Sequence, residues 1–286
     1  EIDILVDLSG HTAGNRLPAF QYRPAPVQVT WLGYPNTTGM TAIDYRLTDA
    51  MADPPGAEAL WTESLIHLDT GFLCYAPPAG APEITPLPAL STGHVTFGSF
   101  NNLRKVTPAV IEIWAKILHA VPGARLMLKA RSFADPATRD RFNSAFAAHG
   151  ITADRLALRN TIASTSEHLG VYADIDIALD PFPYNGTTTT CEAMWMGVPT
   201  VTLRGNRHAA RVCASLLTQT GQHDWIAEDT DGYVATAIRH ATDIDALAEL
   251  RGRLRGTLAN SPLCDAAGFA AEMEAAFEHM AAETGL

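Results

Sequence analysis

Several features that mark whole classes of protein are missing from this 286-residue sequence. No apolar run approaches the roughly 18 residues that cross a bilayer, and no basic-then-apolar signal peptide opens the chain. Positive charge is also scarce, since the formal net charge is −11 at pH 7. Because nucleic acids and anionic membranes bind positively charged surfaces, we expect neither to be the main partner.

Cysteine is scarce and scattered. The four cysteines are Cys74, Cys191, Cys213 and Cys264, and no two form a CxxC pair. This spacing argues against a zinc site and against a disulfide framework. It predicts free thiols in a reducing cytosol.

Four common catalytic signatures are also absent: GxxxxGK[ST], GxGxxG after a strand, HExxH and GxSxG. Their absence disfavours a P-loop kinase, a dinucleotide oxidoreductase, a zinc protease and an α/β-hydrolase. Any nucleotide site must therefore be built on plain loops and helix starts.

The chain opens on Glu1 and enters an apolar strand almost at once, in EIDILVDLSG. We therefore expect that sequence upstream was left out, and with it a neighbouring domain or half-domain. Strands with little helix follow up to residue 75. Five prolines then interrupt regular structure between Ala76 and Pro88, which predicts a linker over residues 76–90.

Strands and helices alternate strictly after this linker. Helices are expected over 108–119, 136–149, 164–172, 208–219, 230–242, 244–258 and 266–283. Such alternation predicts an α/β fold with a doubly wound parallel sheet and helices on both faces. The expected parts are an N-terminal part over 1–75, the linker, a C-terminal domain over 91–260, and a helical part over 261–286 that packs back across the two halves.

One stretch, Ile175 to Leu203 (IDIALDPFPYNGTTTTCEAMWMGVPTVTL), predicts a strand, a loop, a helix and a second strand. The threonines at 187–190 occupy positions typical of helix N-caps, and no more than two of them can serve as caps. A helix start offers unpaired N–H groups and the positive end of the helix dipole. At the carboxyl edge of a parallel sheet, this arrangement predicts a site for the phosphates of a nucleotide.

Two charged residues are candidates for contacts in that site. Lys105 follows the predicted strand Val95 to Phe100 in the loop NNLRKVTP, at the same edge of the sheet. It can neutralise a diphosphate, although most loop lysines face water. Glu192 lies one turn inside the helix that starts at the threonines. There it can accept hydrogen bonds from a ribose or merely favour the helix dipole, and the sequence leaves both alternatives open.

Three histidines and one aspartate occupy loop or edge positions. His11 follows a strand in the turn DLSGHT, His208 precedes a helix after RGNR, and His168 faces the strand edge from a short helix. Each is a candidate ligand contact, although satisfied loop histidines are commoner than functional ones. Asp7 ends its strand beside His11, so it is a candidate for acid–base chemistry or simply a turn former.

Four segments, RPAPVQVTWLGYPNTTG, FGSFNNLRKVTP, LDPFPYNGTTTTCEAMWMGVPTVT and SPLCD, occur in the order of a known family. Together they resemble the catalytic region of the O-GlcNAc transferase and SPINDLY family of protein O-glycosyltransferases. The sequences of these segments are most similar to the SPINDLY branch, whose plant members transfer fucose from GDP-fucose. They are also similar to bacterial relatives that usually carry tetratricopeptide repeats upstream. The resemblance implies a GT-B architecture with two Rossmann-like halves, of which the C-terminal half holds the donor nucleotide.

The resemblance also implies roles for individual residues. Lys105 matches the family lysine that contacts the donor phosphates, and Asn102 matches a polar neighbour in the same loop. The expected donor site is Asn102, Lys105, His168, Thr187, Thr188, Thr189, Glu192 and His208. The expected sugar-facing residues are Thr12, Leu32, Gly33, Pro35 and Tyr184. Asp7, His11 and Lys105 are the candidate catalytic residues, and the leaving phosphate is an alternative proton acceptor.

The sequence departs from the family pattern at three places. The family's first Rossmann strands, with an HPxxH-like histidine near the acceptor, are not in this chain, so the N-terminal half is expected to be incomplete. Thr187 stands where O-GlcNAc transferases have a histidine. Tyr184 stands where they have a smaller residue near the N-acetyl group of the sugar. Because Tyr184 adds bulk, we hypothesise that UDP-GlcNAc is not the obligatory donor and that GDP-fucose is an alternative.

The resulting hypothesis is a cytoplasmic, inverting, metal-independent glycosyltransferase. It would move GlcNAc or fucose from a nucleotide diphosphate to Ser or Thr hydroxyls of proteins, without a cofactor, beside an upstream tetratricopeptide-repeat domain. Lys105 and the helix start would stabilise the leaving diphosphate. Two alternatives stay open: transfer to a small molecule or glycan, and a non-catalytic nucleotide-sugar-binding scaffold on the same fold.

Overall fold

Two parallel β-sheets organise the chain in the computed structural model, which describes residues 2–161 and 164–285. Each sheet belongs to its own unit. Unit 1 comprises residues 1–76, 206–220 and 260–286, and unit 2 comprises residues 77–205 and 221–259. Three separate stretches of sequence therefore build unit 1, and two build unit 2.

The sheet of unit 1 has four parallel strands. They are β1 (Ile4–Asp7), β2 (Val27–Thr30), β3 (Tyr45–Thr48) and β4 (Ser64–His67), paired in that order. The helices of this unit are α1 (Leu17–Phe20), α7 (Val212–Gln219) and α10 (Ala266–Thr284). Because the strands are parallel, the loops that follow them share one edge of the sheet.

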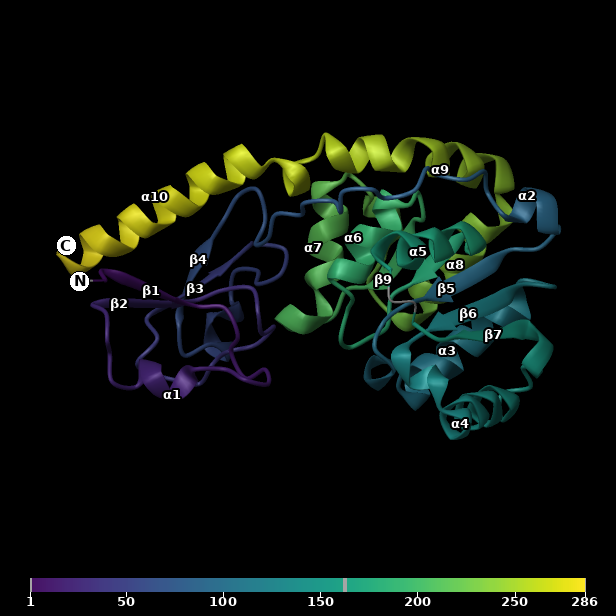
Figure 1. Ribbon diagram of the computed structural model, residues 1–286, viewed down its shortest axis with the longest axis horizontal. Coiled ribbons are helices and arrows are strands. Elements are labelled where there is room, and N and C mark those ends of the chain that lie inside the picture. Colours follow the sequence, from purple (N-terminus) through teal and green to yellow (C-terminus); the bar gives the residue numbers. More distant parts are fainter. Residues whose placement is uncertain (1, 162–163, 286) are drawn as a thin grey trace. The chain divides into compact units, whose positions relative to one another are not determined.

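α10 packs against the sheet of unit 1, and Figure 1 shows it running beside β4 and β2. Phe269, Ala276 and Met280 recur at helical spacing and are buried against Val27 and Val29 of β2. A smaller cluster is formed by Leu17 and Phe20 of α1 with Ile43. The apolar faces of both helices thus explain why short strands suffice here.

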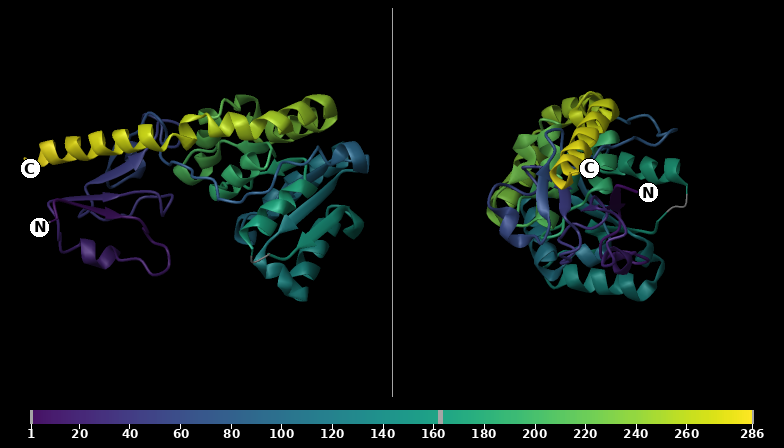
Figure 2. Two further views of the ribbon diagram at one scale, coloured as in Figure 1. Left: turned by 45° about the horizontal axis from the view of Figure 1, so that its top comes forward. Right: turned by 90° about the vertical axis from the view of Figure 1, so that its left-hand side faces the viewer.

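The sheet of unit 2 has six parallel strands in the order β10-β9-β8-β5-β6-β7. They are β5 (Thr96–Ser99), β6 (Arg125–Lys129), β7 (Leu156–Arg159), β8 (Ile177–Leu179), β9 (Thr200–Leu203) and β10 (Ile226–Ala227). The helices are α2 (Ala89–Thr92), α3 (Pro108–Ala120), α4 (Pro136–Ala147), α5 (Thr165–Gly170), α6 (Thr188–Trp195), α8 (Thr230–Thr242) and α9 (Ile244–Ala259). Helices cover both faces of this sheet (Figures 1 and 2), so the predicted doubly wound α/β fold is confirmed.

Some predicted helix bounds were wrong. The helix expected over 164–172 ends at Gly170 and continues as a 3₁₀ turn over Val171–Asp174. The helix expected over 208–219 is a 3₁₀ turn over His208–Ala210 followed by α7, because Arg211 departs from helical geometry with φ −127° and ψ −9°. Helical periodicity does not distinguish a 3₁₀ turn from the first turn of an α-helix.

Residues 206–220 lie within the domain expected over 91–260, but their contacts place them in unit 1. Ser215 of α7 donates a hydrogen bond of 2.6 Å to Asp49, and His208 contacts Asp53 at 2.7 Å. No local pattern in the sequence predicts such long-range partners.

Among the described residues, no helix has the length and the apolar character that crossing a membrane requires.

Arg251 of α9 ties the proline-rich stretch to the sheet of unit 2. Its side chain is 1% exposed and donates to the carbonyl oxygens of Thr85 at 2.8 Å, Ile175 at 2.9 Å and Tyr172 at 3.2 Å. Burial lowers the pKa of Arg251 to about 10, against the charge of Asp176. Three carbonyl groups, from two separate segments of the chain, therefore depend on one guanidinium group.

Replacing Arg251 by Met should lower the free energy of unfolding by about 3 kcal/mol, because three carbonyl groups, two of them in buried residues, lose their donor. Arg253→Met, two residues along the same helix on an exposed side chain, should change it by less than about 0.5 kcal/mol. Urea denaturation of both variants gives the comparison. Equal losses would show that Arg251 acts only through its apolar stem.

Candidate functional site

The candidate site of unit 2 lies where the strand order reverses. β5 and β8 are neighbours, and the chain runs from β5 towards β7 on one side and from β8 towards β10 on the other. In open parallel sheets the loops at such a switch point diverge and leave a crevice for ligands at the carboxyl edge. The two loops here are residues 100–107 after β5 and residues 180–187 after β8.

Asp180 anchors the loop that follows β8. Its carboxylate is 1% exposed and accepts hydrogen bonds from Gly186 N at 2.6 Å and Thr202 Oγ1 at 2.8 Å. Its carbonyl oxygen accepts from Tyr233 Oη at 3.0 Å. A Cβ atom on Gly186 would lie 2.5 Å from Thr189 Oγ1, so any larger residue here would displace the threonine side chain at the helix start. Sequence reasoning missed both residues, although an Asp at a strand end and a Gly before a helix start were visible signals.

Lys105 joins the two loops. Its Nζ donates a hydrogen bond of 2.6 Å to the carbonyl oxygen of Asn185 and lies 3.9 Å from the centre of the Tyr184 ring. Tyr184 is 44% exposed, so the ring is open to a ligand as well as to the ammonium group. Asn102, by contrast, uses its Oδ1 to accept from Arg104 N at 3.0 Å and so shapes the turn that carries Lys105.

The start of α6 has no side-chain cap. Thr187 precedes the helix but makes no capping hydrogen bond, and its carbonyl oxygen accepts from Thr190 N and Cys191 N. Thr189 Oγ1 donates instead to Asn101 Oδ1 at 3.1 Å. A threonine therefore occupies the N-cap position, as the sequence pattern indicated, but its side chain makes no capping hydrogen bond. An uncapped helix start keeps its first N–H groups available for an anion.

Glu192, His168 and Lys129 form a continuous polar contact from α6 to the end of β6. His168 Nε2 lies 3.1 Å from Glu192 Oε2, and His168 Nδ1 lies 2.8 Å from Lys129 Nζ. Because an ammonium group can only donate, Nδ1 is the acceptor and Nε2–H donates to the carboxylate. Lys129 also donates to the carbonyl oxygen of His168 at 2.9 Å. The imidazole is thus held in one tautomer and one orientation.

Lys129 was not predicted as a site residue. Its side chain is 2% exposed, and its Nζ lies 4.4 Å from the centre of the Phe100 ring. Burial lowers the pKa of Lys129 to about 8, against the charge of Glu192. The sequence feature that could have indicated it is a single lysine at the end of the apolar strand RLMLK. Lys129 lines a cavity of about 240 Å³ together with Phe100, Asn101, Asn102, Arg131 and His168.

The candidate residues of unit 1 lie in the loops after β1 and β2. Asp7 is 4% exposed, and its carboxylate accepts from Gly10 N at 2.9 Å and Thr30 Oγ1 at 2.8 Å. His11 is exposed, and its Nε2 lies 2.8 Å from the carbonyl oxygen of Thr38. Since a carbonyl oxygen only accepts, His11 carries its proton on Nε2 and keeps Nδ1 as an acceptor in the neutral form.

Leu32 has an unusual backbone in this loop region. Its φ is +66°, in the left-handed region, and its side chain is 43% exposed. A bulky residue rarely adopts this conformation unless the surrounding structure imposes it. The next residue, Gly33, lies close to the preceding loop, because a Cβ there would lie 1.9 Å from the carbonyl oxygen of Leu8. The loop that carries Thr12 and the loop that carries Leu32, Gly33 and Pro35 are therefore in direct backbone contact.

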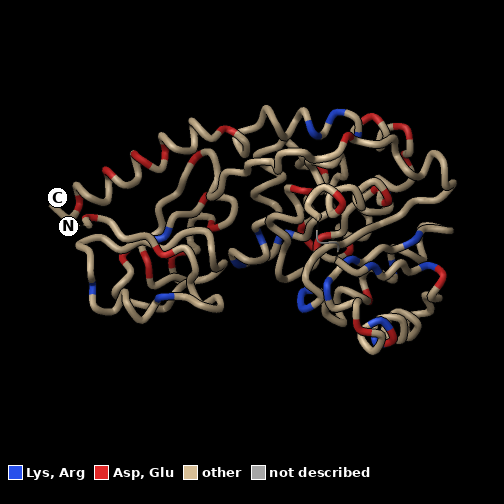
Figure 3. Tube along the Cα trace, in the orientation of Figure 1, with Lys and Arg blue, Asp and Glu red and all other residues tan. Residues whose placement is uncertain are grey.

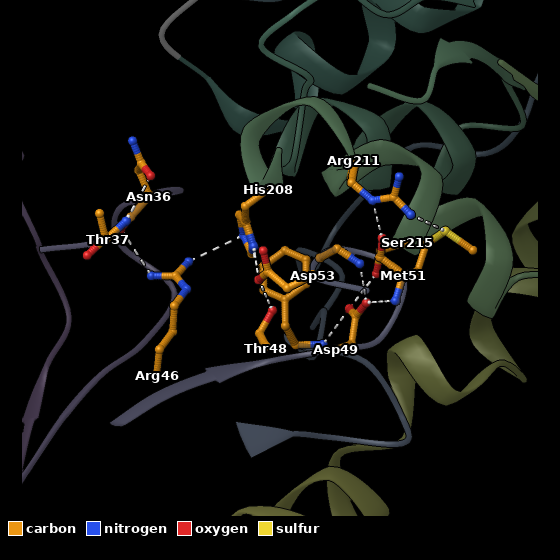
Figure 4. Close-up of polar contacts among 12 residues, drawn as sticks. Asn36, Thr37, Arg46, Thr48, Asp49, Met51, Asp53, His208, Arg211 and Ser215 are labelled. Carbon is orange, nitrogen blue, oxygen red and sulfur yellow. Dashed lines mark hydrogen bonds and ion pairs between the residues drawn. The ribbon is translucent and has the colours of Figure 1, made fainter. Parts of the chain in front are cut away.

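His208 is part of a buried polar cluster in unit 1 (Figure 4). Its side chain is 3% exposed, with Nδ1 2.7 Å from Asp53 Oδ2 and Nε2 3.4 Å from Arg46 Nη2. Burial lowers the pKa of His208, while Asp53 opposes the change. Burial also lowers the pKa of Arg46 to about 10, against the charges of Asp53, Glu63 and Asp7. Both ring nitrogens of His208 are thus engaged with protein groups.

The structure therefore separates the predicted residues into two sets. Unit 2 brings together Asn102, Lys105, His168, Tyr184, Thr187, Thr188, Thr189 and Glu192 around the switch point. Unit 1 holds Asp7, His11, Thr12, Leu32, Gly33 and Pro35 in its loops, and it also holds His208. His208 is the one residue expected at the donor site that belongs to unit 1.

Comparison with known proteins identifies the family. Residues 1–75 and 87–273 match the description Glycosyl transferase family 41. The chain belongs to glycosyl transferase family 41. It is 49% identical over 280 residues to the tomato (Solanum lycopersicum) protein named probable UDP-N-acetylglucosamine--peptide N-acetylglucosaminyltransferase SPINDLY, covering 98% of this chain and 30% of that protein. It is 32% identical to the Arabidopsis thaliana protein of the same type named SEC, covering 98% of this chain and 29% of that protein.

Solved structures agree with this family 41 assignment. A mutant of the O-GlcNAc transferase from Thermobaculum terrenum superposes with a TM-score of 0.93 at 42% identity, covering 99% of this chain and 54% of that one. TarM shares the fold alone, with a TM-score of 0.60 at 9% identity. The predicted GT-B class is confirmed, as is the resemblance to the O-GlcNAc transferase and SPINDLY family. The chain spans about 30% of the length of the curated relatives that it matches.

The buried amine of Lys129 predicts a specific pH dependence of stability. Between the folded pKa of about 8 and the unfolded value of 10.5, the unfolded chain binds a proton that the folded protein does not. Stability relative to Lys129→Met should therefore rise with pH across that window, by up to about 1.4 kcal/mol per pH unit. Urea midpoints of both proteins at pH 7.5, 9 and 10 measure it, and a constant difference would contradict it.

Proposed function

We propose that this family 41 chain forms the catalytic region of a protein O-glycosyltransferase. It would transfer a sugar from a nucleotide diphosphate to Ser or Thr hydroxyls. The observation that carries the proposal is the position of Lys105, bonded to the loop after β8 beside the uncapped start of α6. The plant relatives are named probable peptide N-acetylglucosaminyltransferases, and these names support protein or peptide acceptors.

The proposed reaction is a single displacement with inversion. The acceptor oxygen forms a bond to the anomeric carbon, the bond from that carbon to the phosphate oxygen breaks, and the hydroxyl proton passes to a base. Negative charge then develops on the leaving diphosphate. Lys105 and the first N–H groups of α6 would stabilise this charge, and in this proposal they take the part that a metal ion plays in other transferases.

The geometry gives two residues different parts in this scheme. The carboxylate of Asp7 is committed to a turn N–H and a threonine hydroxyl, whereas Nδ1 of His11 remains an acceptor. We therefore favour His11 over Asp7 as the residue that takes the proton. In unit 2, Glu192 is oriented by His168 and Lys129 in a way that suits a ribose hydroxyl.

The proposal extends to the donor and the setting. Tyr184 lies against Lys105 and adds bulk beside the phosphate position, which favours a sugar without a 2-acetamido group, such as the fucose of GDP-fucose. A cytoplasmic location and a tetratricopeptide-repeat region upstream are included on the strength of the resemblance alone.

Loss of Lys105 should remove transfer activity. In the full-length protein, Lys105→Ala should lower kcat by about 100-fold to 1,000-fold, as expected when a main charge-stabilising group is lost. Lys116→Ala is the matched control, since Lys116 is an exposed lysine of the same unit, paired with Glu112 at 2.9 Å. Transfer from labelled nucleotide sugar to a peptide gives the readout. Full activity of Lys105→Ala would contradict the proposal.

The donor can be identified by titration calorimetry on the full-length protein. We expect GDP-fucose to bind more tightly than UDP-GlcNAc, and Tyr184→Ala to improve binding of UDP-GlcNAc because it removes the bulky ring. Tight binding of UDP-GlcNAc with none of GDP-fucose would reject the assignment of fucose while leaving glycosyl transfer intact.

A further inference from the structure

Positive charge is concentrated in one part of this acidic chain. Residues 101–160 carry ten of the 20 Lys and Arg residues and four of the 31 Asp and Glu residues. The opposite extreme is α10, which carries Glu272, Glu274, Glu278 and Glu283 and no Lys or Arg, so that it is marked in red alone in Figure 3. Because the net charge of the protein is −11, we expect this local positive charge to serve a specific contact.

Most cations of residues 101–160 have a partner within the protein. Arg139 and Arg155 donate to backbone carbonyl oxygens, Arg159 pairs with Asp174, and Lys116 pairs with Glu112. Lys105 and Lys129 belong to the site described above. Arg104, Arg125, Arg131 and Arg141 remain, and none of these four forms an ion pair with a residue that the structure describes.

Three of these four arginines line a single groove of unit 2. Arg104, Arg131 and Arg141 surround a cavity of about 940 Å³ between the loop after β5, α3 and α4. All three are exposed. Arg125 is different, because it begins β6 at the amino edge of the sheet, whereas Arg131 follows the carboxyl end of the same strand. The groove therefore contains three of the four arginines of this region that form no ion pair with a described residue.

The groove also offers apolar surface. Val106, Ile111 and Phe142 line it beside the arginines, and the guanidinium of Arg141 lies 5.4 Å from the centre of the Phe142 ring. Apolar walls with a few charged groups are typical of sites that bind side chains rather than a bare phosphate backbone. A nucleic acid would need a wider positive field than this acidic chain provides.

The groove is continuous with the candidate donor pocket. Asn102, Leu103, Arg131 and Ser132 line both the groove and the smaller cavity that contains Lys129 and His168. A polypeptide lying in the groove therefore passes beside the site at which the donor would bind.

We infer that this arginine groove docks an acidic segment of the polypeptide acceptor, with carboxylates on Arg104, Arg131 and Arg141 and apolar side chains between them. The inference rests on the proposed function, and it adds a substrate class: acceptors with Asp or Glu near the modified hydroxyl. Arginine suits this role because its planar fork pairs with carboxylates in two-pronged hydrogen bonds.

Fluorescence anisotropy on the full chain tests the inference with three labelled peptides. Each contains one Ser and two Leu, and the remaining positions are Glu, Gln or Lys. We expect the Glu peptide to bind at least about tenfold more tightly than the Gln peptide at low salt, with the difference shrinking as salt is added. The Lys peptide should not bind measurably.

Charge reversal separates the groove from general charge effects. Arg141→Glu should weaken binding of the Glu peptide by about tenfold, the size of one lost charge-assisted hydrogen bond. Arg125→Glu makes the same change in net charge at the opposite edge of the sheet and should alter binding less than about twofold. Circular dichroism of both variants confirms folding, and affinity for a nucleoside diphosphate should be the same in both.

The outcomes distinguish this inference from the proposed function. Peptide binding that ignores peptide charge, that falls equally in Arg125→Glu, or that is displaced by an equal concentration of single-stranded DNA overturns the arginine groove as an acceptor site. Charge-selective peptide binding that Arg141→Glu abolishes supports it, even if no sugar is transferred. In that last case the proposed transfer reaction fails, and the groove stands as a peptide site.

Discussion

The carboxylate of Asp180 holds the candidate site of unit 2 together. Asp180 directly follows β8, at the carboxyl edge of the parallel sheet, and it is almost fully buried. A buried carboxylate is stable only if its oxygens accept hydrogen bonds. Gly186 N and Thr202 Oγ1 supply them, and this requirement bends the loop after β8 back onto β9. Tyr233 extends the same constraint to α8 and, through Trp114, to α3.

The rest of the unit 2 site follows from that bend. With Gly186 fixed, Asn185 presents its carbonyl oxygen to Lys105, and α6 begins at Thr188 without a side-chain cap. Thr187 at the cap position makes no capping hydrogen bond, and the hydroxyl of Thr189 donates to Asn101. The ammonium group of Lys105 and the start of α6 are thereby held against the same loop, the one that follows β8. Rigid placement of such groups is what allows them to stabilise developing charge without reorganisation.

Local patterns in the sequence were sufficient to predict the strands and helices, but not which residues the polar side chains contact. Alternating apolar strands and amphipathic helices predicted the parallel sheet of unit 2, and the shared carboxyl edge predicted that Lys105 and the threonine loop would lie near each other. Lys129 escaped prediction because its role depends on His168, 39 residues away. His208 was assigned to the donor site because it sits in a loop before a helix, yet its environment is set by Asp53, 155 residues away. Periodicity reports which face of an element is buried, whereas the partner of a polar side chain is decided by tertiary contacts.

The two units handle buried charge in different ways, and the difference bears on function. In unit 1 the guanidinium of Arg46 is buried near Asp53, Glu63 and His208, so its positive charge is balanced by acidic groups inside the fold. In unit 2 the deeply buried Arg251 also donates to backbone carbonyls. Arg104, Arg131 and Arg141, which line the groove, form no ion pair with a described residue. Exposed arginines that stay unpaired repel one another and gain nothing for stability. Their grouping beside the donor pocket is therefore best explained by a ligand that brings its own negative charge, and a polypeptide acceptor is the ligand that the proposed reaction requires.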